Sequence, residues 1–174
     1  MDIKNKLLSA AGSLFYRHGF NATGMDRLTQ AAGMSSRTLY KHAGSKTALI
    51  VRVLEARDQS FFAQMEEQSI KGLFDALDDW LREEDCLGCL FLRAYGETGG
   101  DNPQIAAVIR AHKEKTWQTI RRLVASEIGH EDDRLAEQIL ILFEGATAAA
   151  IYRGVGTVAT ARDTAALLLA GAKA

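Results

Sequence analysis

The sequence predicts an all-α fold of about nine helices, because apolar side chains recur at helical spacing along almost the whole chain. Proline, the commonest helix breaker, occurs only at Pro103. No segment alternates apolar and polar residues for long, as a half-buried strand would. Apolar residues make up 47% of the 174 residues and charged residues 25%, so the composition can supply a packed core.

The first three predicted helices are short and have clear start and stop signals. Gly19 can adopt the left-handed conformation that ends the first of them. Thr23 and Asp26 have the spacing of a capping box, in which a hydroxyl and a carboxylate three residues later cap a helix start. Ser35 can cap the third helix in the same way. The expected ranges are about 3–18, 24–33 and 36–42.

The later predicted helices are mostly longer. Ser45 can cap a fourth helix that carries Phe61 and Met65. The sequence Asp101-Asn102-Pro103 is a good start signal, since proline suits the first helical position. Glycines at 154 and 156 predict a break before the last helix. The remaining expected ranges are about 70–85, 88–98, 103–128, 132–154 and 161–173.

Charge is divided unevenly along the chain. The net charge is −1, yet residues 1–57 contain nine Lys or Arg and only three Asp or Glu. Residues 58–174 contain 12 basic and 19 acidic residues. A basic N-terminal part on an acidic body favours a polyanionic partner at the N-terminal end.

Several function classes lack support in the sequence. No glycine-rich phosphate loop or Ser/His/Asp signature is present, so we expect neither an enzyme nor a cofactor. The histidines are scattered and only one C-x-x-C pair occurs, which argues against a metal site. No run of 18 uncharged apolar residues and no signal-peptide core occur, so we expect a cytoplasmic location and no membrane contact.

Residues 25–42 form a candidate helix-turn-helix, two short helices joined by Gly33-Met34-Ser35. The second helix has Ser36, Arg37 and Lys41 on its expected outer face, where they can reach base edges in a major groove. Three small helices bury little surface by themselves. They therefore need a shared core, for which the candidates are Leu7, Phe15, Phe20, Leu28 and Leu39.

The stretch from Leu7 to Ile50 resembles the N-terminal domain of the TetR (tetracycline-repressor) family. The matching pieces are Phe15, GFNAT at 19–23, AAG at 31–33, TLYKH at 38–42 and SK at 45–46. A looser resemblance, to one type of ligand-binding domain in that family, covers GCLFLRAYGE at 88–97 and the last two helices.

Two positions depart from the family pattern. Thr29 stands where alanine is common, and its hydroxyl can bond to the preceding helical turn. Ala43 replaces a common aromatic residue, so we expect a looser junction between the third and fourth helices.

The resemblance implies a sequence-specific transcriptional regulator, namely a repressor released from its operator by a small-molecule inducer of unknown identity. It places the DNA-binding domain at 1–46 and a helical ligand-binding and dimerisation domain at 47–174. The roles that it implies are base contacts from Ser36, Arg37 and Lys41, and phosphate contacts from Thr23, Thr38, Tyr40, His42 and Lys46. Alternatives remain open: a core aromatic at Tyr40, a helix C-cap at His42 and a solvated lysine at Lys46.

One short reading helix contacts too few bases for genomic specificity, so a homodimer on a palindromic double-stranded operator is expected. Small and apolar side chains on the last two helices are the interface candidates, namely Ala146, Ala149, Ala150, Leu167 and Leu168. In the resembled family these helices form a four-helix bundle with their twofold mates. The alternative is that alanine here only raises helix propensity.

The resemblance also implies an inducer enclosed between the later helices. The candidate ligand-binding residues are Phe61, Met65, Phe91, Tyr95, His112, Trp117 and Phe143. Each could equally be an ordinary core residue.

Two other functions stay open. Cys86 and Cys89 form a C-x-x-C pair, which allows a thiol-responsive or redox-responsive DNA-binding regulator. No βαβ pattern surrounds the pair, so a thioredoxin-like enzyme is disfavoured. The remaining alternative is a helical protein-interaction module with a vestigial helix-turn-helix, which would bind DNA weakly and without sequence preference.

Overall fold

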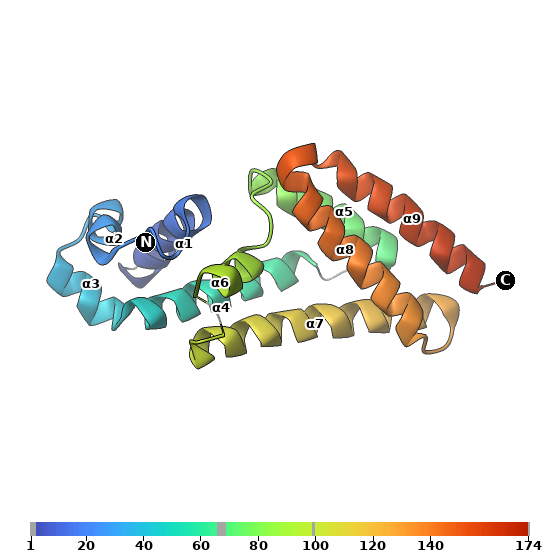
Figure 1. The fold of residues 1–174 in the computed structure, drawn as a ribbon, viewed down its shortest axis with the longest axis horizontal. Helices are drawn as coiled ribbons and strands as arrows, with labels where there is room; N and C mark the ends of the chain where they lie inside the picture. Colours follow the sequence, from blue (N-terminus) through green and yellow to red (C-terminus); the bar gives the residue numbers. More distant parts are fainter. Residues whose placement is uncertain (1–2, 66–68, 99, 174) are drawn as a thin grey trace. The chain divides into compact units, whose positions relative to one another are not determined.

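The structure is a computed structural model that describes residues 3–65, 69–98 and 100–173. Within these ranges the chain forms nine α-helices and no strand, which confirms the predicted all-α fold (Figure 1). The helices are α1 (Ile3–His18), α2 (Met25–Ala32), α3 (Ser36–Ala43), α4 (Lys46–Gln64), α5 (Ile70–Glu83), α6 (Leu90–Thr98), α7 (Pro103–Ile128), α8 (Asp133–Arg153) and α9 (Gly156–Ala172).

The described residues divide into two compact units. The first unit comprises residues 1–59 and 90–112, and the second comprises residues 60–89 and 113–174. Helices α4 and α7 each begin in the first unit and end in the second. The first unit is therefore larger than the predicted DNA-binding segment 1–46, because it also includes most of α4, all of α6 and the start of α7.

The first three helices pack on the core that the sequence predicted. Five side chains in this core are at most 1% exposed: Leu7, Phe15, Phe20, Leu28 and Leu39. The rings of Phe15 and Phe20 stack with their centroids 4.8 Å apart. Phe20 follows the end of α1, so this stacking ties the loop after α1 to the helix before it.

The two predicted helix caps, Ser35 and Ser45, are present, and Asn102, which was predicted only as part of a start signal, supplies a third. Ser35 Oγ accepts a hydrogen bond from Thr38 N at 3.2 Å, and Ser45 Oγ accepts one from Ala48 N at 3.0 Å. Asn102 Oδ1 accepts one from Ile105 N at 3.2 Å, just before α7 begins. Each bond satisfies an N–H group that the first turn of a helix leaves without an intrahelical partner.

Two predictions about helix starts are wrong. Gly24, not Thr23, precedes α2, and no side chain caps that helix. The Thr23 hydroxyl donates instead to Gly19 O at 2.6 Å, four residues back. The last helix begins at Gly156, five residues before the predicted 161, because glycine here opens the helix and does not interrupt it.

The second unit has one continuous apolar core built from α5, α8, α9 and the last turns of α7. The rings of Phe74 and Phe143 meet edge to face across it, with centroids 5.8 Å apart. In Figure 1, α8 and α9 run side by side in opposite directions. Among the described helices, α8 is long and apolar enough to cross a membrane, by length and composition alone. A core helix passes the same test, and seven residues of α8 are buried here.

Candidate nucleic-acid interface

Helix α3 has a clear division between an outer and an inner face. Leu39 and Ala43 are fully buried, four residues apart along the helix. Ser36, Arg37, Tyr40 and Lys41 are exposed on the other side, and Tyr40 is 51% exposed. This exposure contradicts the alternative that Tyr40 is a core aromatic. We call these four residues the outer row of α3.

The turn before α3 has the geometry of a helix-turn-helix. Gly33 ends α2 in the left-handed conformation, with φ 59° and ψ 45°. Its N–H donates to Gln30 O, and the N–H of Met34 donates to Thr29 O at 3.2 Å. Both bonds satisfy carbonyls that the end of a helix leaves open, so the chain reverses within a few residues.

The far end of α3 is held by a side chain that the sequence gave no reason to single out. The guanidinium of Arg52, on α4, donates to the carbonyls of both His42 and Ala43, the latter at 2.9 Å. Ala43 itself is buried without exposed area. The expected loosening at Ala43 is therefore wrong, because Arg52 joins α3 to α4 through the backbone. The other departure is accommodated as expected, since Thr29 Oγ1 donates to Met25 O at 2.8 Å.

Three of the five candidate phosphate ligands border the outer row. Thr38, His42 and Lys46 are half-buried, and Lys46 is the first residue of α4. Thr23 differs from them because it is 0% exposed and its hydroxyl is bonded to Gly19 O. A buried side chain cannot reach a phosphate, so the phosphate contact predicted for Thr23 is corrected. In the structure Thr23 holds the loop before α2.

Within the first unit, α6 is bonded to the loop between α1 and α2. The Glu97 carboxylate accepts a hydrogen bond from Asn21 N at 2.9 Å, and Asn21 Nδ2 donates to Glu97 O at 2.6 Å. Arg93 donates to Glu97 Oε1 at 2.9 Å and to Tyr16 O at 2.6 Å. We call this set of bonds the α6 clamp. Sequence reasoning missed it, although Glu97 ends the GCLFLRAYGE segment.

The α6 clamp holds Glu97 in its charged form. Partial burial favours the neutral acid, but hydrogen bonds from the Asn21 backbone and from Arg93 outweigh burial and lower the pKa of Glu97 below its ordinary value. The carboxylate is therefore charged at neutral pH and keeps the α1–α2 loop attached to α6.

Residues 7–53, which include the whole helix-turn-helix and the outer row, match the family described as bacterial regulatory proteins, tetR family. These residues therefore form a TetR-family DNA-binding domain. The curated relatives of the chain are transcriptional regulators and not enzymes. TetR-family regulators bind DNA operators and small-molecule ligands and act as dimers.

Curated relatives extend the TetR-family match beyond the helix-turn-helix. The transcriptional activator FasR of Mycolicibacterium smegmatis is 26% identical over 140 residues, 75% of this chain and 63% of FasR. The regulator QacR of Staphylococcus aureus is 30% identical over 71 residues, 41% of this chain and 38% of QacR. The matches thus span less than two thirds of these two proteins. The Escherichia coli repressor ComR is 26% identical over 160 residues, 82% of this chain and 76% of ComR.

Solved TetR-family structures share the fold along nearly the whole chain. A TetR-family regulator from Streptomyces coelicolor superposes with a TM-score of 0.86 at 23% identity, covering 99% of this chain and 96% of that one. A TetR-type regulator from Streptomyces avermitilis gives a TM-score of 0.75 at 27% identity, covering 95% and 99%.

The seven ligand-binding candidates are divided between the two units. Phe91, Tyr95 and His112 belong to the first unit; the other four, Phe61, Met65, Trp117 and Phe143, belong to the second. Tyr95 is 45% exposed and does not lie on a buried helix face as expected. His112 is 4% exposed, stacks on Phe91 with centroids 3.6 Å apart, and bonds through Nδ1 to Asp58 Oδ1 at 2.8 Å. Its Nδ1 is thus engaged within the protein.

The four candidates of the second unit behave as core or edge residues. Phe61, Met65 and Phe143 are buried and Trp117 is half-buried, all in or against the apolar core. Met65 lies one residue past the end of α4, not on the helix as predicted. Their burial leaves the inducer site a prediction.

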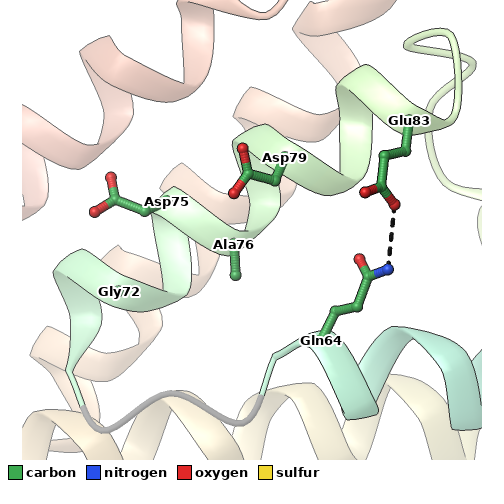
Figure 2. Close-up of a pocket in the computed structure, with 6 residues that line it drawn as sticks. All are labelled: Gln64, Gly72, Asp75, Ala76, Asp79 and Glu83. Carbon is green, nitrogen blue, oxygen red and sulfur yellow. Dashed lines mark hydrogen bonds between the residues drawn. The ribbon is translucent and has the colours of Figure 1, made fainter.

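Two cavities in the second unit are lined by other residues. The first, of about 470 Å³, lies beside α5, and Figure 2 shows its three carboxylates spaced along that helix. Its lining is Gln64, Gly72, Asp75, Ala76, Asp79 and Glu83, with Gln64 Nε2 donating to Glu83 at 3.2 Å. The second, of about 600 Å³, is lined by Ile70, Lys71, Glu127, Arg162, Asp163, Ala166, Leu169, Ala170 and Lys173. Neither contains a predicted ligand-binding residue.

The dimer candidates separate into an inward and an outward group. Ala146 and Ala150 are at most 5% exposed and pack in the second unit's own core, which corrects their assignment to an interface. Ala149 and Leu168 are half-buried, and Leu167 is 75% exposed. Sequence reasoning missed other large apolar side chains exposed on α8, namely Ile141, Ile151 and Tyr152.

Proposed function

We propose that this chain is a homodimeric transcriptional repressor that reads a palindromic operator through α3 and is released by a small-molecule inducer. The observation that carries the proposal is the outer row of α3. Its four side chains are exposed, whereas the helix is held by other groups: buried Leu39, the Ser35 cap and the Arg52 bonds. Side chains free of a structural role on a rigid helix are suited to base readout.

The outer row and its border have the chemistry that DNA requires. Arg37 can donate two hydrogen bonds to a guanine edge, worth about 1–3 kcal/mol of discrimination. Ser36 and Lys41 are the other proposed base contacts, and Thr38, Tyr40, His42 and Lys46 the proposed phosphate contacts. Lys46 starts α4, where unpaired backbone N–H groups already favour an anion.

The exposed apolar residues of α8 and α9 are the proposed dimer interface. Ile141 and Ile151 are 65% and 59% exposed, and Leu167 is 75% exposed. Exposing large apolar side chains on neighbouring helices is unfavourable in water, and covering them with a second copy removes that cost. Two copies would also supply the two reading helices that a palindrome needs.

Inducer release is proposed as a shift between two states that differ in operator affinity. A ligand that prefers the low-affinity state lowers DNA binding by its differential affinity, about 1–3 kcal/mol in typical systems. We place this regulator in the cytoplasm, where its operator would be.

Selection of bound duplexes from a random library by the purified protein tests the proposal. We expect a palindromic site, bound with an affinity that falls steeply with salt. Lys46→Ala removes one phosphate contact per subunit, so the slope of log affinity against log salt should fall by about 0.9 per contact. Lys71→Ala is the matched control, because Lys71 is an exposed lysine in the second unit.

The outcomes separate the candidate functions. A protein that prefers no duplex over competitor DNA at moderate salt would refute operator recognition and favour the protein-interaction alternative.

For the dimer, Leu167→Asp should convert the protein to monomers in sedimentation velocity. An unchanged dimer in that variant would refute the proposed interface.

A further inference from the structure

Cys89, Lys113 and Glu144 form a cluster in the second unit, which we call the Cys89 cluster. Lys113 Nζ, on α7, lies 3.4 Å from Cys89 Sγ. The same ammonium donates to both carboxylate oxygens of Glu144, on α8, at 2.7 and 2.9 Å. Lys113 and Glu144 are each 26% exposed by side chain, and Cys89 is half-buried. The cluster thus places a thiol beside a cation that is itself anchored.

Lys113 is charged in this environment. Burial favours the neutral amine, but the attraction of Cys89 and Glu144 outweighs burial and raises the pKa of Lys113 above its ordinary value. The 3.4 Å contact places the Lys113 ammonium where it can hold a thiolate, the nucleophilic form of cysteine, once one forms. Cys89 also comes directly before α6 begins at Leu90, and helix N-termini stabilise thiolates as well.

Cys86 has a different environment, although it belongs to the same C-x-x-C pair. Its side chain packs against the apolar core of the second unit. The nearby Arg82 donates to Asp78, at 2.6 Å from its Nε. The hydrogen bond to Asp78 raises the pKa of Arg82 most, and Cys86 also helps to raise it. The two cysteines differ in that Cys89 Sγ has an ammonium 3.4 Å away, which gives an internal comparison.

We propose that Cys89 is a reactive thiol that is activated by Lys113 and takes soft carbon electrophiles of the α,β-unsaturated carbonyl class. The thiol proton leaves to solvent, and the thiolate is held by the Lys113 ammonium. The sulfur then forms a bond to the β-carbon of the electrophile while the carbon–carbon π bond breaks. The resulting enolate takes one proton at its α-carbon, so the product is a thioether and no atom is oxidised or reduced overall.

A regulatory consequence rests on the proposed function. An adduct on Cys89 lies one residue before α6, the helix whose Arg93 and Glu97 hold the α1–α2 loop. Modification removes the sulfur that Lys113 contacts and adds bulk where α6 begins. Operator affinity of the adduct is therefore expected to fall.

The test measures the rate at which N-ethylmaleimide modifies each cysteine, by peptide mass spectrometry at limiting reagent. We expect Cys89 to react about tenfold faster than Cys86 or more. Lys113→Met should lower the modification rate of Cys89 by a similar factor and leave the rate of Cys86 unchanged. The unchanged rate of Cys86 also reports that the variant is folded. Lys113→Arg keeps the charge and should keep most of the rate, and Cys86→Ser should leave the Cys89 rate unaltered.

Equal rates at the two cysteines, or a Cys89 rate that Lys113→Met does not change, would overturn the reactive thiol. Operator binding by the singly modified Cys86→Ser protein tests the regulatory consequence. If Cys89 reacts as proposed but its adduct binds the operator as tightly as before, the regulatory link is refuted and the thiol chemistry stands. If the unmodified protein binds no operator, the proposed function fails, and the rates still decide the reactivity.

Discussion

Replacing Gly19 with alanine tests whether the α6 clamp stabilises the DNA-binding end of the chain. Gly19 follows α1 with φ +87°, and a Cβ there would lie 2.5 Å from Glu97 Oε1. The atoms in its way belong to the end of a flexible side chain, so Glu97 can move aside. By moving, Glu97 would lose its hydrogen bonds to Asn21 N and Arg93.

The expected loss of stability has two parts. A non-glycine residue in the left-handed conformation costs about 1–2 kcal/mol. Loss of the two Glu97 hydrogen bonds adds about 1–2 kcal/mol in total, which is below the range of about 1.5–3 kcal/mol per bond for charged groups because water can reach both partners. Gly19→Ala should therefore lower the free energy of unfolding by about 2–4 kcal/mol.

Gly129 supplies the matched control, with φ +86° and nothing within 4 Å of a built Cβ. Gly129→Ala should show only the backbone cost of about 1–2 kcal/mol. The assay is urea unfolding followed by circular dichroism, with hydrogen exchange of α1 and α2 peptides to locate the effect. Once Glu97→Ala has removed the obstacle, Gly19→Ala should cost no more than Gly129→Ala. Additive costs in the Gly19→Ala/Glu97→Ala double variant would refute the role of the clamp.

Two further predictions concern the same unit. Leu39→Ala should destabilise the helix-turn-helix by about 2–5 kcal/mol, since the side chain is fully buried. DNA binding should be lost, while the fluorescence of Trp80 and Trp117, in the second unit, stays native. Retained operator binding would contradict the core position assigned to Leu39. The pKa of Glu97 is lowered in the folded protein, so its contribution is present above its unfolded pKa of about 4.3 and is lost as pH falls through the lower folded value. The stability difference between wild type and Glu97→Gln should accordingly shrink from pH 7 to about pH 3, and a constant difference in denaturant titrations would count against the clamp's charge.

The features that could be predicted from the sequence are those set by near neighbours in the chain. Ser35 and Ser45 each accept a hydrogen bond from the N–H three residues ahead, and this spacing is visible without a structure. The inward position of Leu39 follows from helical periodicity in the same way. Thr23 shows the limit of such spacing rules. Its hydroxyl was expected to cap α2, but it donates a hydrogen bond to Gly19 O, four residues back.

The features that escaped prediction join polar residues far apart in sequence. Asn21 and Glu97 are 76 residues apart, and Lys113 and Glu144 are 31 apart. Neither pair produces a periodic signal, since each residue alone looks like an ordinary polar surface residue. The dimer contacts predicted for Ala146 and Ala150, on α8, were wrong for a related reason. Small side chains permit close packing, but composition does not say whether the neighbouring helix is α9 or belongs to a second copy.

The separation of roles on α3 has a consequence for how such a protein can change its target. Because the side chains of Ser36, Arg37, Tyr40 and Lys41 are exposed and not packed in the core among the described residues, their identities can vary with little penalty to folding. Randomising these four codons while keeping Leu39, Ala43 and Arg52 should yield mostly well-folded variants. New operator preferences could then be selected on an unchanged scaffold.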